Sequence, residues 1–168
     1  MLLRDAYIKL GTVPDCSVVR KTWAELSTSE LYEFLKLRTD VFFVEQHVDE
    51  EELDYRDLEP TTEHLWIADD RGTAAYLRTL VDPAPSHRDA RRLFGRVVTR
   101  ADRRGEGLSQ LLIAEVIRLY GHEAMVLHAQ EYIAPLYAKF GFEAFGEVYV
   151  EAGIPHISMY RAGSATAL

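Results

Sequence analysis

The stretch Arg104-Gly105-Glu106-Gly107-Leu108-Ser109 decides the fold of this chain. An apolar run at 93–99 before it indicates a β-strand, and apolar residues at helical spacing indicate a helix over 104–120. The first turn of a helix has unpaired N–H groups and a partial positive charge, and glycine lets a phosphate group approach the backbone. Arg100 and Arg103, with Arg104, add local positive charge. The stretch therefore predicts a phosphate site, although a G-x-G before a helix is also typical of a tight turn alone.

The order of elements along the chain disfavours a doubly wound nucleotide fold. Strands are expected at 18–23, 64–69, 73–81, 93–99, 124–129, 142–150 and 156–160, and helices after the capping box Ser27-Thr28-Ser29-Glu30, at 104–120 and at 132–140. This β-α-β-β-β-α-β-α-β-β order predicts one mixed α/β domain over 17–161, between an irregular extension at 1–16 and a tail at 162–168. The stretch also lacks the Walker lysine and the three-glycine Rossmann fingerprint.

Composition and charge restrict the partners that the chain can have. Its 168 residues are 48% hydrophobic and contain a single cysteine, Cys16, so an intramolecular disulfide is ruled out. We find neither a signal peptide nor an apolar run that could cross a membrane, and we therefore expect a cytoplasmic protein with no membrane partner. The net charge of −8 disfavours nucleic acid; it would attract a cationic amine, or serve solubility alone.

Two segments together resemble the cofactor-binding motifs of GNAT N-acetyltransferases. Val97-Val98-Thr99 followed by the stretch at 104–109 is similar to the family's acetyl-CoA motif, R/Q-x-x-G-x-G/A, with Ser109 in place of the usual Gly or Ala. The segment 130–142, QEYIAPLYAKFGF, resembles the family's N-x-x-A-x-x-L-Y-x-x-x-G-F. Gln130 stands there for Asn and Ile133 for Ala, while Tyr137 and the final Gly-Phe match.

A third set of residues resembles the ElaA-like branch of this family. It consists of Leu37-Arg38, the segment 41–46 (VFFVEQ) and the segment 153–159 (GIPHISM). With the first two segments, the resemblance covers about residues 20–161. It implies the GNAT acyl-CoA N-acyltransferase fold, in which a central, mostly antiparallel mixed sheet with splayed strands is flanked by helices.

The resemblance implies an acetyltransferase with acetyl-CoA as co-substrate and no metal. Pantetheine would lie between the strand at 97–99 and Ala129-Gln130, pairing with the backbone as an added strand does. A backbone N–H of Val97 or Val98 would stabilise the oxyanion of a tetrahedral intermediate, formed by direct attack of a primary amine of a small molecule or peptide. The implied cofactor-binding residues are Val97, Val98, Thr99, Arg104, Gly105, Glu106, Gly107, Leu108, Ser109, Gln130 and Tyr137.

The resemblance also implies catalytic roles for a few side chains. Tyr137 stands where family members carry a tyrosine that protonates the leaving thiolate, although it could instead be a core aromatic beside Leu136 and Phe140. The amine needs a base, for which Glu45 and His156 are the candidates. His64, His128 and a water relay are alternatives. Cys16 is not needed as a nucleophile, because the attack is direct.

Several alternatives remain at this stage. The chain could be an acyl-CoA-binding sensor or partner module without turnover, or it could use a hydroxyl acceptor or a longer acyl chain. The loop at 49–60 carries seven carboxylates, which could gather a cationic substrate or form a solvated loop. A calcium site there is rejected because the glycine of a calcium loop is missing. A homodimer formed through the closing strands is a further expectation from the family.

Overall fold

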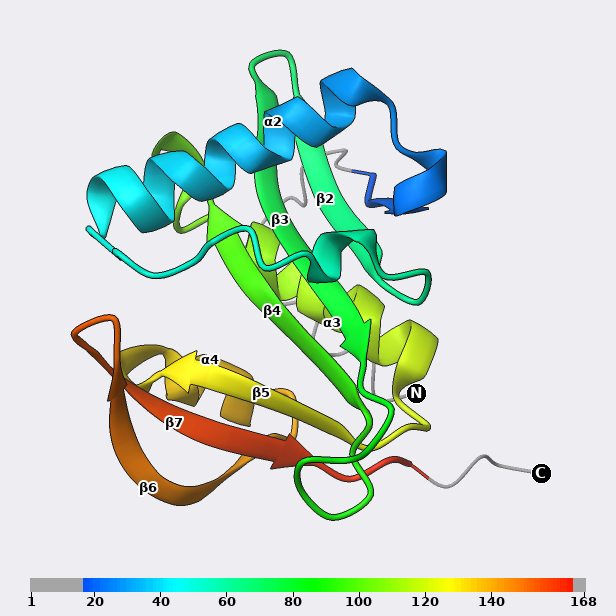
Figure 1. The fold of residues 1–168 in the computed structure, drawn as a ribbon, viewed down its shortest axis with the longest axis vertical. Coiled ribbons are helices and arrows are strands. Elements are labelled where there is room, and N and C mark those ends of the chain that lie inside the picture. The colour runs from blue at the N-terminus through cyan, green and yellow to red at the C-terminus, as the bar shows by residue number, and fades with distance from the viewer. Residues whose placement is uncertain (1–16, 165–168) are drawn as a thin grey trace.

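The computed structural model describes residues 17–164, and a seven-stranded sheet forms its centre (Figure 1). The predictions for residues 1–16, including Cys16, and for 165–168 lie outside the described residues. The strand order is β1-β2-β3-β4-β5-β7-β6, and all neighbouring strands run antiparallel except β4 and β5. The strands are β1 Val19–Thr22, β2 Glu63–Asp69, β3 Gly72–Val81, β4 Arg92–Thr99, β5 Met125–Gln130, β6 Glu143–Glu151 and β7 Ile154–Arg161.

The helices are short and several have non-α geometry. The α-helices are α2 Thr28–Arg38, α3 Leu108–Tyr120 and α4 Ala134–Ala138, and α2 continues into a π-helical segment, η2, at Thr39–Glu45. The 3-10 helices are η1 Trp23–Glu25, η3 Arg56–Leu58, η4 Ala101–Arg103 and η5 Glu131–Ile133. This architecture confirms the predicted mixed α/β GNAT fold with a sheet flanked by helices.

Every predicted strand is present, with bounds that differ by at most two residues. Two helix predictions were wrong in extent. The helix expected at 104–120 begins only at Leu108, because Gly105 (φ 82°) and Gly107 (φ 79°) adopt left-handed conformations that an α-helix does not contain. The helix expected at 132–140 is α-helical only over Ala134–Ala138, and Gly141 (φ 83°) follows in the left-handed region.

Helices cover both faces of the sheet (Figure 1). The amphipathic helix α3 packs its fully buried Leu112, Ile113 and Val116 against one face. On the other face, α2 inserts Phe34, whose ring stacks on Tyr76 with centroids 4.6 Å apart. The two layers bury a core on each side of the central strands.

The central strands β4 and β5 diverge along their length (Figure 1). They pair only at Arg92 with Met125 and at Leu93 with Val126, which confirms the predicted splay of the strand at 97–99 from Gln130. The register between β3 and β4 shifts in the part of β4 that diverges from β5, and Arg96, which lies at this shift, has a φ of 54°. A non-glycine residue in this region costs about 1–2 kcal/mol, so the surrounding structure must hold the bulge in place.

Candidate functional site

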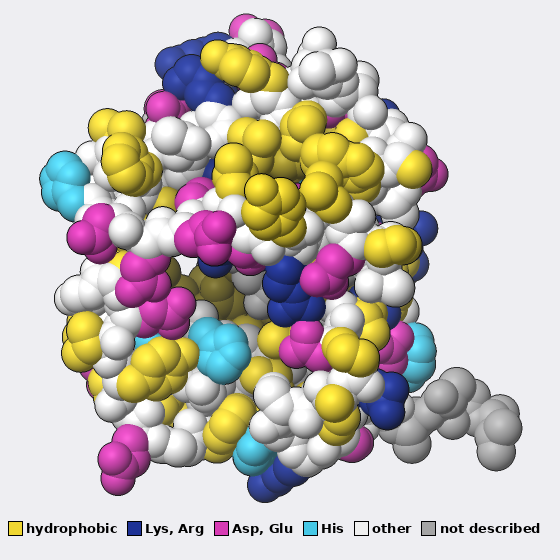
Figure 2. Space-filling model, in the orientation of Figure 1, with side chains coloured by type: hydrophobic (Ala, Val, Ile, Leu, Met, Phe, Trp, Pro, Cys, Tyr) yellow, Lys and Arg dark blue, Asp and Glu magenta, His cyan; other side chains and the backbone are white. Residues whose placement is uncertain are grey.

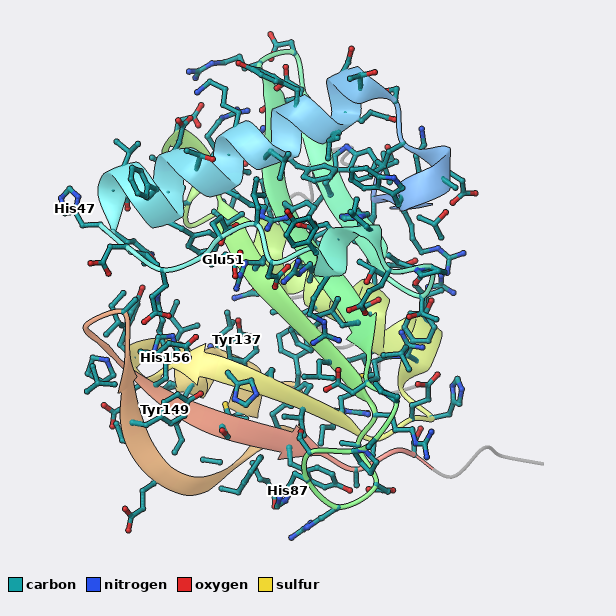
Figure 3. All side chains as sticks on the ribbon, viewed as in Figure 1. His47, Glu51, His87, Tyr137, Tyr149 and His156 are labelled. Carbon is teal, nitrogen blue, oxygen red and sulfur yellow. The ribbon has the colours of Figure 1, made fainter. Side chains whose placement is uncertain are left out.

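A cleft of about 940 Å³ opens where β4 and β5 diverge. Its walls come from these two strands, from the β6–β7 turn, from α4 and from the loop that follows η2. The space-filling view shows this hollow between the layer that contains α2 and the lower layer that contains β5 and β7 (Figure 2). Tyr137, His156 and Glu51 all line it (Figure 3).

The helix α3 begins at one side of this cleft with an uncapped amino terminus. Its N-cap is Gly107, which has no side chain to occupy the first N–H groups. Gly105 precedes it in the left-handed region, and an added Cβ there would meet no atom within 4 Å. Ser109 and Thr99 tie the helix to β4 through a hydroxyl pair 2.5 Å apart. The predicted phosphate site therefore has free backbone donors, open space and a fixed position beside β4.

The arginines beside this helix terminus provide less free charge than the sequence suggests. Arg100 binds Asp69 at 2.6 Å and Asp102 at 2.6 Å, and Arg103 contacts Asp69 and Glu106. Arg104 binds both carboxylate oxygens of Glu45. Each guanidinium is therefore matched by an acid, so the attraction for phosphate must come mainly from the helix terminus.

The surroundings of Tyr137 bear on both roles considered for it. The residue is 7% exposed, and its ring packs against Phe94 and Phe142 at centroid distances of 6.0 and 6.4 Å. The residue also lines the cleft. Burial raises the pKa of Tyr137 above its ordinary value, so the hydroxyl keeps its proton at neutral pH but is a weaker acid than that of a free tyrosine.

The candidate bases differ sharply in their surroundings. Both carboxylate oxygens of Glu45 accept hydrogen bonds from Arg104 at 2.8 Å, and this contact lowers the pKa of Glu45. His156 lines the cleft, and its Nδ1 lies 2.8 Å from the Ile154 carbonyl oxygen. Since a carbonyl can only accept, Nδ1 must carry the proton, and Nε2 of the neutral ring holds the lone pair.

His64 lies away from this cleft. Its side chain is fully buried and contacts the Tyr76 hydroxyl at 2.7 Å and the Asp57 carbonyl at 3.2 Å. The ring also stacks on Phe34 at 5.0 Å. His64 is therefore a core histidine with both nitrogens partnered, and we remove it from the possible bases.

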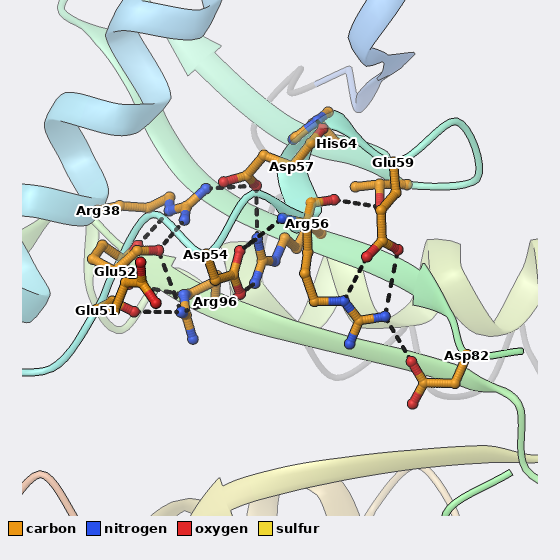
Figure 4. A network of polar contacts seen from close by, with 12 residues as sticks. Arg38, Glu51, Glu52, Asp54, Arg56, Asp57, Glu59, His64, Asp82 and Arg96 are labelled. Atoms are coloured by element: carbon orange, nitrogen blue, oxygen red, sulfur yellow. Dashed lines mark hydrogen bonds and ion pairs between the residues drawn. The ribbon is translucent and has the colours of Figure 1, made fainter. Parts of the chain in front are cut away.

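Three arginines, one from α2 and two from the sheet, clamp the acidic loop, and the sequence did not indicate them as a group (Figure 4). Arg38 is fully buried and binds Glu52 at 2.5 Å and Asp57 at 2.9 Å. Arg78 from β3 binds Asp57 at 2.9 Å and also contacts Asp54, while Arg96 binds Glu52 at 2.8 Å. The sequence feature that could have indicated these contacts is a charged residue within an apolar strand or on the apolar face of a helix, because a buried charge requires a buried partner.

This clamp gives most carboxylates of the acidic loop a structural role that differs from both interpretations. Burial by itself would raise the pKa of Asp54, but the hydrogen bond and charge of Arg78 outweigh it and lower the pKa to about 2. Glu59 pairs with Arg56 at 2.9 Å, and Glu50 accepts a hydrogen bond from the Ala152 N–H at 2.8 Å. Most of the loop's carboxylates therefore hold the cleft wall together instead of forming a free acidic patch.

A contact across the cleft involves the predicted cofactor residue Gln130. Its Nε2 donates to Oε1 of Gln46 at 3.0 Å, which joins the end of β5 to the residue that follows η2. The sequence analysis placed Gln46 in a family-typical segment and assigned it no role. The distance along the chain, 84 residues, explains why no local pattern could indicate the pair.

Two other kinds of site were searched for among residues 17–164. No group of three or more His, Cys, Asp or Glu side chains within this part of the chain could hold a metal ion. No helix in the same part is long and apolar enough to span a bilayer.

Comparisons with known proteins agree with this geometry. Residues 29–162 match the family model described as an acetyltransferase (GNAT) domain. A UPF0039 protein of Mycobacterium tuberculosis is 37% identical over 149 residues, which cover 87% of this chain and 94% of the relative. Protein ElaA of Escherichia coli is 37% identical over 149 residues, covering 82% of this chain and 91% of ElaA.

Two solved structures superpose on most of the chain. The crystal structure of an acyl-CoA N-acyltransferase from Pseudomonas aeruginosa has a TM-score of 0.78 and 38% identity, and it covers 88% of this chain and 100% of its own. The crystal structure of Escherichia coli ElaA has a TM-score of 0.77 and 31% identity, with coverage of 87% and 99%. The similarity therefore extends over the cleft and both of its walls.

Proposed function

Since the chain belongs to the GNAT acetyltransferase family, we propose that it transfers an acetyl group from acetyl-CoA to a primary amine. The observation that carries this proposal is the gap between β4 and β5 beside the uncapped terminus of α3. The gap offers unpaired strand edges to an extended ligand, and the helix terminus offers N–H groups to a phosphate. One ligand that combines an extended amide chain with a pyrophosphate fits both features.

The residues of the stretch at 104–109 would hold the pyrophosphate through backbone N–H groups. The pantetheine arm would lie along Val97–Thr99, facing Gln130 across the splay. The bulge at Arg96 would direct the N–H of Val97 or Val98 at the acyl oxygen, where negative charge develops during attack. Gln130 would have to exchange its contact with Gln46 for one with the ligand.

Two side chains would then manage the proton transfers. Tyr137 would protonate the leaving thiolate, because its hydroxyl is held protonated at the cleft. His156 is favoured as the base over Glu45, since its tautomer leaves a lone pair on Nε2 while Glu45 is engaged by Arg104. Imidazole is the side chain that most often serves as a general base in proteins.

The proposed activity is tested by release of CoA thiol from acetyl-CoA over a panel of alkylamines, polyamines and peptide amino termini. We expect acetyl-CoA to raise the melting temperature, as any ligand selective for the native state does. At least one amine should accelerate thiol release. A protein that binds acetyl-CoA yet stays silent over the whole panel would be a sensor, and absence of any melting shift at millimolar acetyl-CoA would refute the cofactor.

Substituting Gly107 by alanine should weaken acetyl-CoA binding by about tenfold or more, because a Cβ at the N-cap would crowd the phosphate. The loss of a contact worth about 1.4 kcal/mol changes the dissociation constant by a factor of ten. Gly146→Ala is the matched control, since Gly146 has a similar φ of 73° in β6. Both changes place a Cβ on a residue with a positive φ. Calorimetric titration should find reduced affinity in Gly107→Ala only; equal affinities would place the phosphate elsewhere.

A further inference from the structure

A polar cluster on the sheet face of the cleft has no role in the function proposed so far. His128 of β5 is exposed there, and its Nδ1 lies 3.1 Å from the Ser158 hydroxyl of β7 and 3.0 Å from the Tyr149 hydroxyl of β6. His128 lines the same cleft as His156. No described residue is recorded as a hydrogen-bond partner of its Nε2, so this nitrogen is available to a ligand.

The proton balance of N-acetylation calls for a base with a route to solvent. A primary amine enters as an ammonium group, with a pKa near 10 by analogy with lysine, and must lose one proton before its nitrogen can attack. When the C–N bond has formed, the same nitrogen must lose a second proton to become an amide. His156 can accept this second proton, which is balanced by the one that the thiolate takes up after the C–S bond breaks. The first proton is therefore the net proton of the reaction, and it has to leave the cleft to solvent.

We propose that His128 is a further catalytic residue, which takes the first proton from the incoming ammonium group at Nε2 and releases a proton from Nδ1 to solvent, with the hydroxyls of Ser158 and Tyr149 as the relay. This inference rests on the proposed function. In the receptive tautomer, Nδ1–H donates to one of the two hydroxyls and Nε2 carries the lone pair. Ser158 and Tyr149 are then positioning residues, because they orient the ring and accept the outgoing proton without touching the amine.

The surroundings of His128 suit this task. The cleft walls desolvate the imidazole, and this lowers the pKa of His128 below its ordinary value of 6.5, so the ring arrives neutral. The charged groups that act on it are Glu151 and Asp82, which oppose this shift, and His156, which adds to it. Burial also raises the pKa of Tyr149, which keeps the neighbouring hydroxyl protonated.

The test is the pH profile of kcat/KM for the best amine of the panel, with His128→Gln compared with wild type. At pH 7 we expect a loss of about 100-fold, within the usual range for general acid–base catalysis. The loss should shrink below about tenfold near pH 10, where the amine arrives unprotonated. His122→Gln is the control, since the His122 side chain is 55% exposed and lies outside the cleft lining.

A second measurement separates proton transfer from packing. Ethylamine and 2,2,2-trifluoroethylamine have similar shapes, but the fluorinated amine is unprotonated at neutral pH. The loss caused by His128→Gln at pH 7 should be at least tenfold smaller with trifluoroethylamine, and Ser158→Ala should show a weaker version of the same pattern. A loss that is equal for both amines and constant with pH, or no loss, would overturn the inference. A wild-type protein inactive with every amine would instead refute the proposed function.

Discussion

Arg38→Met is expected to lower the free energy of unfolding by about 3–5 kcal/mol, which is the usual result of removing one partner from a buried ion pair. Arg38 has no solvent exposure, and its guanidinium binds Glu52, Asp57 and the Glu52 carbonyl. Methionine fills a similar volume but removes one of the two arginines that bind each of Glu52 and Asp57, so that only Arg96 and Arg78 remain as partners. The penalty comes from buried carboxylates that lose part of their compensating charge.

Urea unfolding monitored by circular dichroism measures this effect. Lys36→Met is the control from the same helix, because Lys36 pairs with Asp40 at 2.5 Å while its side chain stays 57% exposed. An exposed pair of that kind contributes little to stability. If both variants lost the same small amount, the clamp on the acidic loop would have no energetic importance. Because that loop forms one wall of the cleft, Arg38→Met should also raise KM for the amine.

Tyr137→Phe should lower kcat by about 100-fold or more, the typical contribution of a positioned general acid. The change removes only the hydroxyl, and the ring can still pack against Phe94 and Phe142. We therefore expect the affinity for CoA and the melting temperature to stay close to those of wild type. Steady-state kinetics and calorimetric titration with CoA measure the two quantities separately.

The control for this experiment is Tyr132→Phe. Tyr132 also lines the cleft, but 69% of it is exposed and it has no aromatic packing of the kind that holds Tyr137. The Tyr132→Phe substitution should therefore have little effect on kcat. Parallel losses of kcat, CoA affinity and stability in Tyr137→Phe would make Tyr137 a packing residue, and the thiolate would then have to take its proton from water.

The local patterns of the chain were sufficient for its secondary structure. The alternation of strands and helices, the glycines before α3 and the capping box of α2 all depend on neighbours within a few residues. In the structure, the Ser27 hydroxyl accepts from the Glu30 N–H at 3.2 Å, as the capping box predicts. Where local prediction was wrong, at the starts of α3 and α4, glycine conformation or a short 3-10 turn determined the boundary.

The sequence by itself therefore determined the order of the elements and the position of the glycine loop before α3, because hydrogen bonding and side-chain period act over short separations. Only the tertiary structure decided which charges are free. It paired Arg104 with Glu45, which is 59 residues away, and Arg78 with Asp57, which is 21 residues away. It also placed His128 against Tyr149 and Ser158. A side chain's partners depend on how the strands pair, and strand pairing joins residues that no local pattern connects.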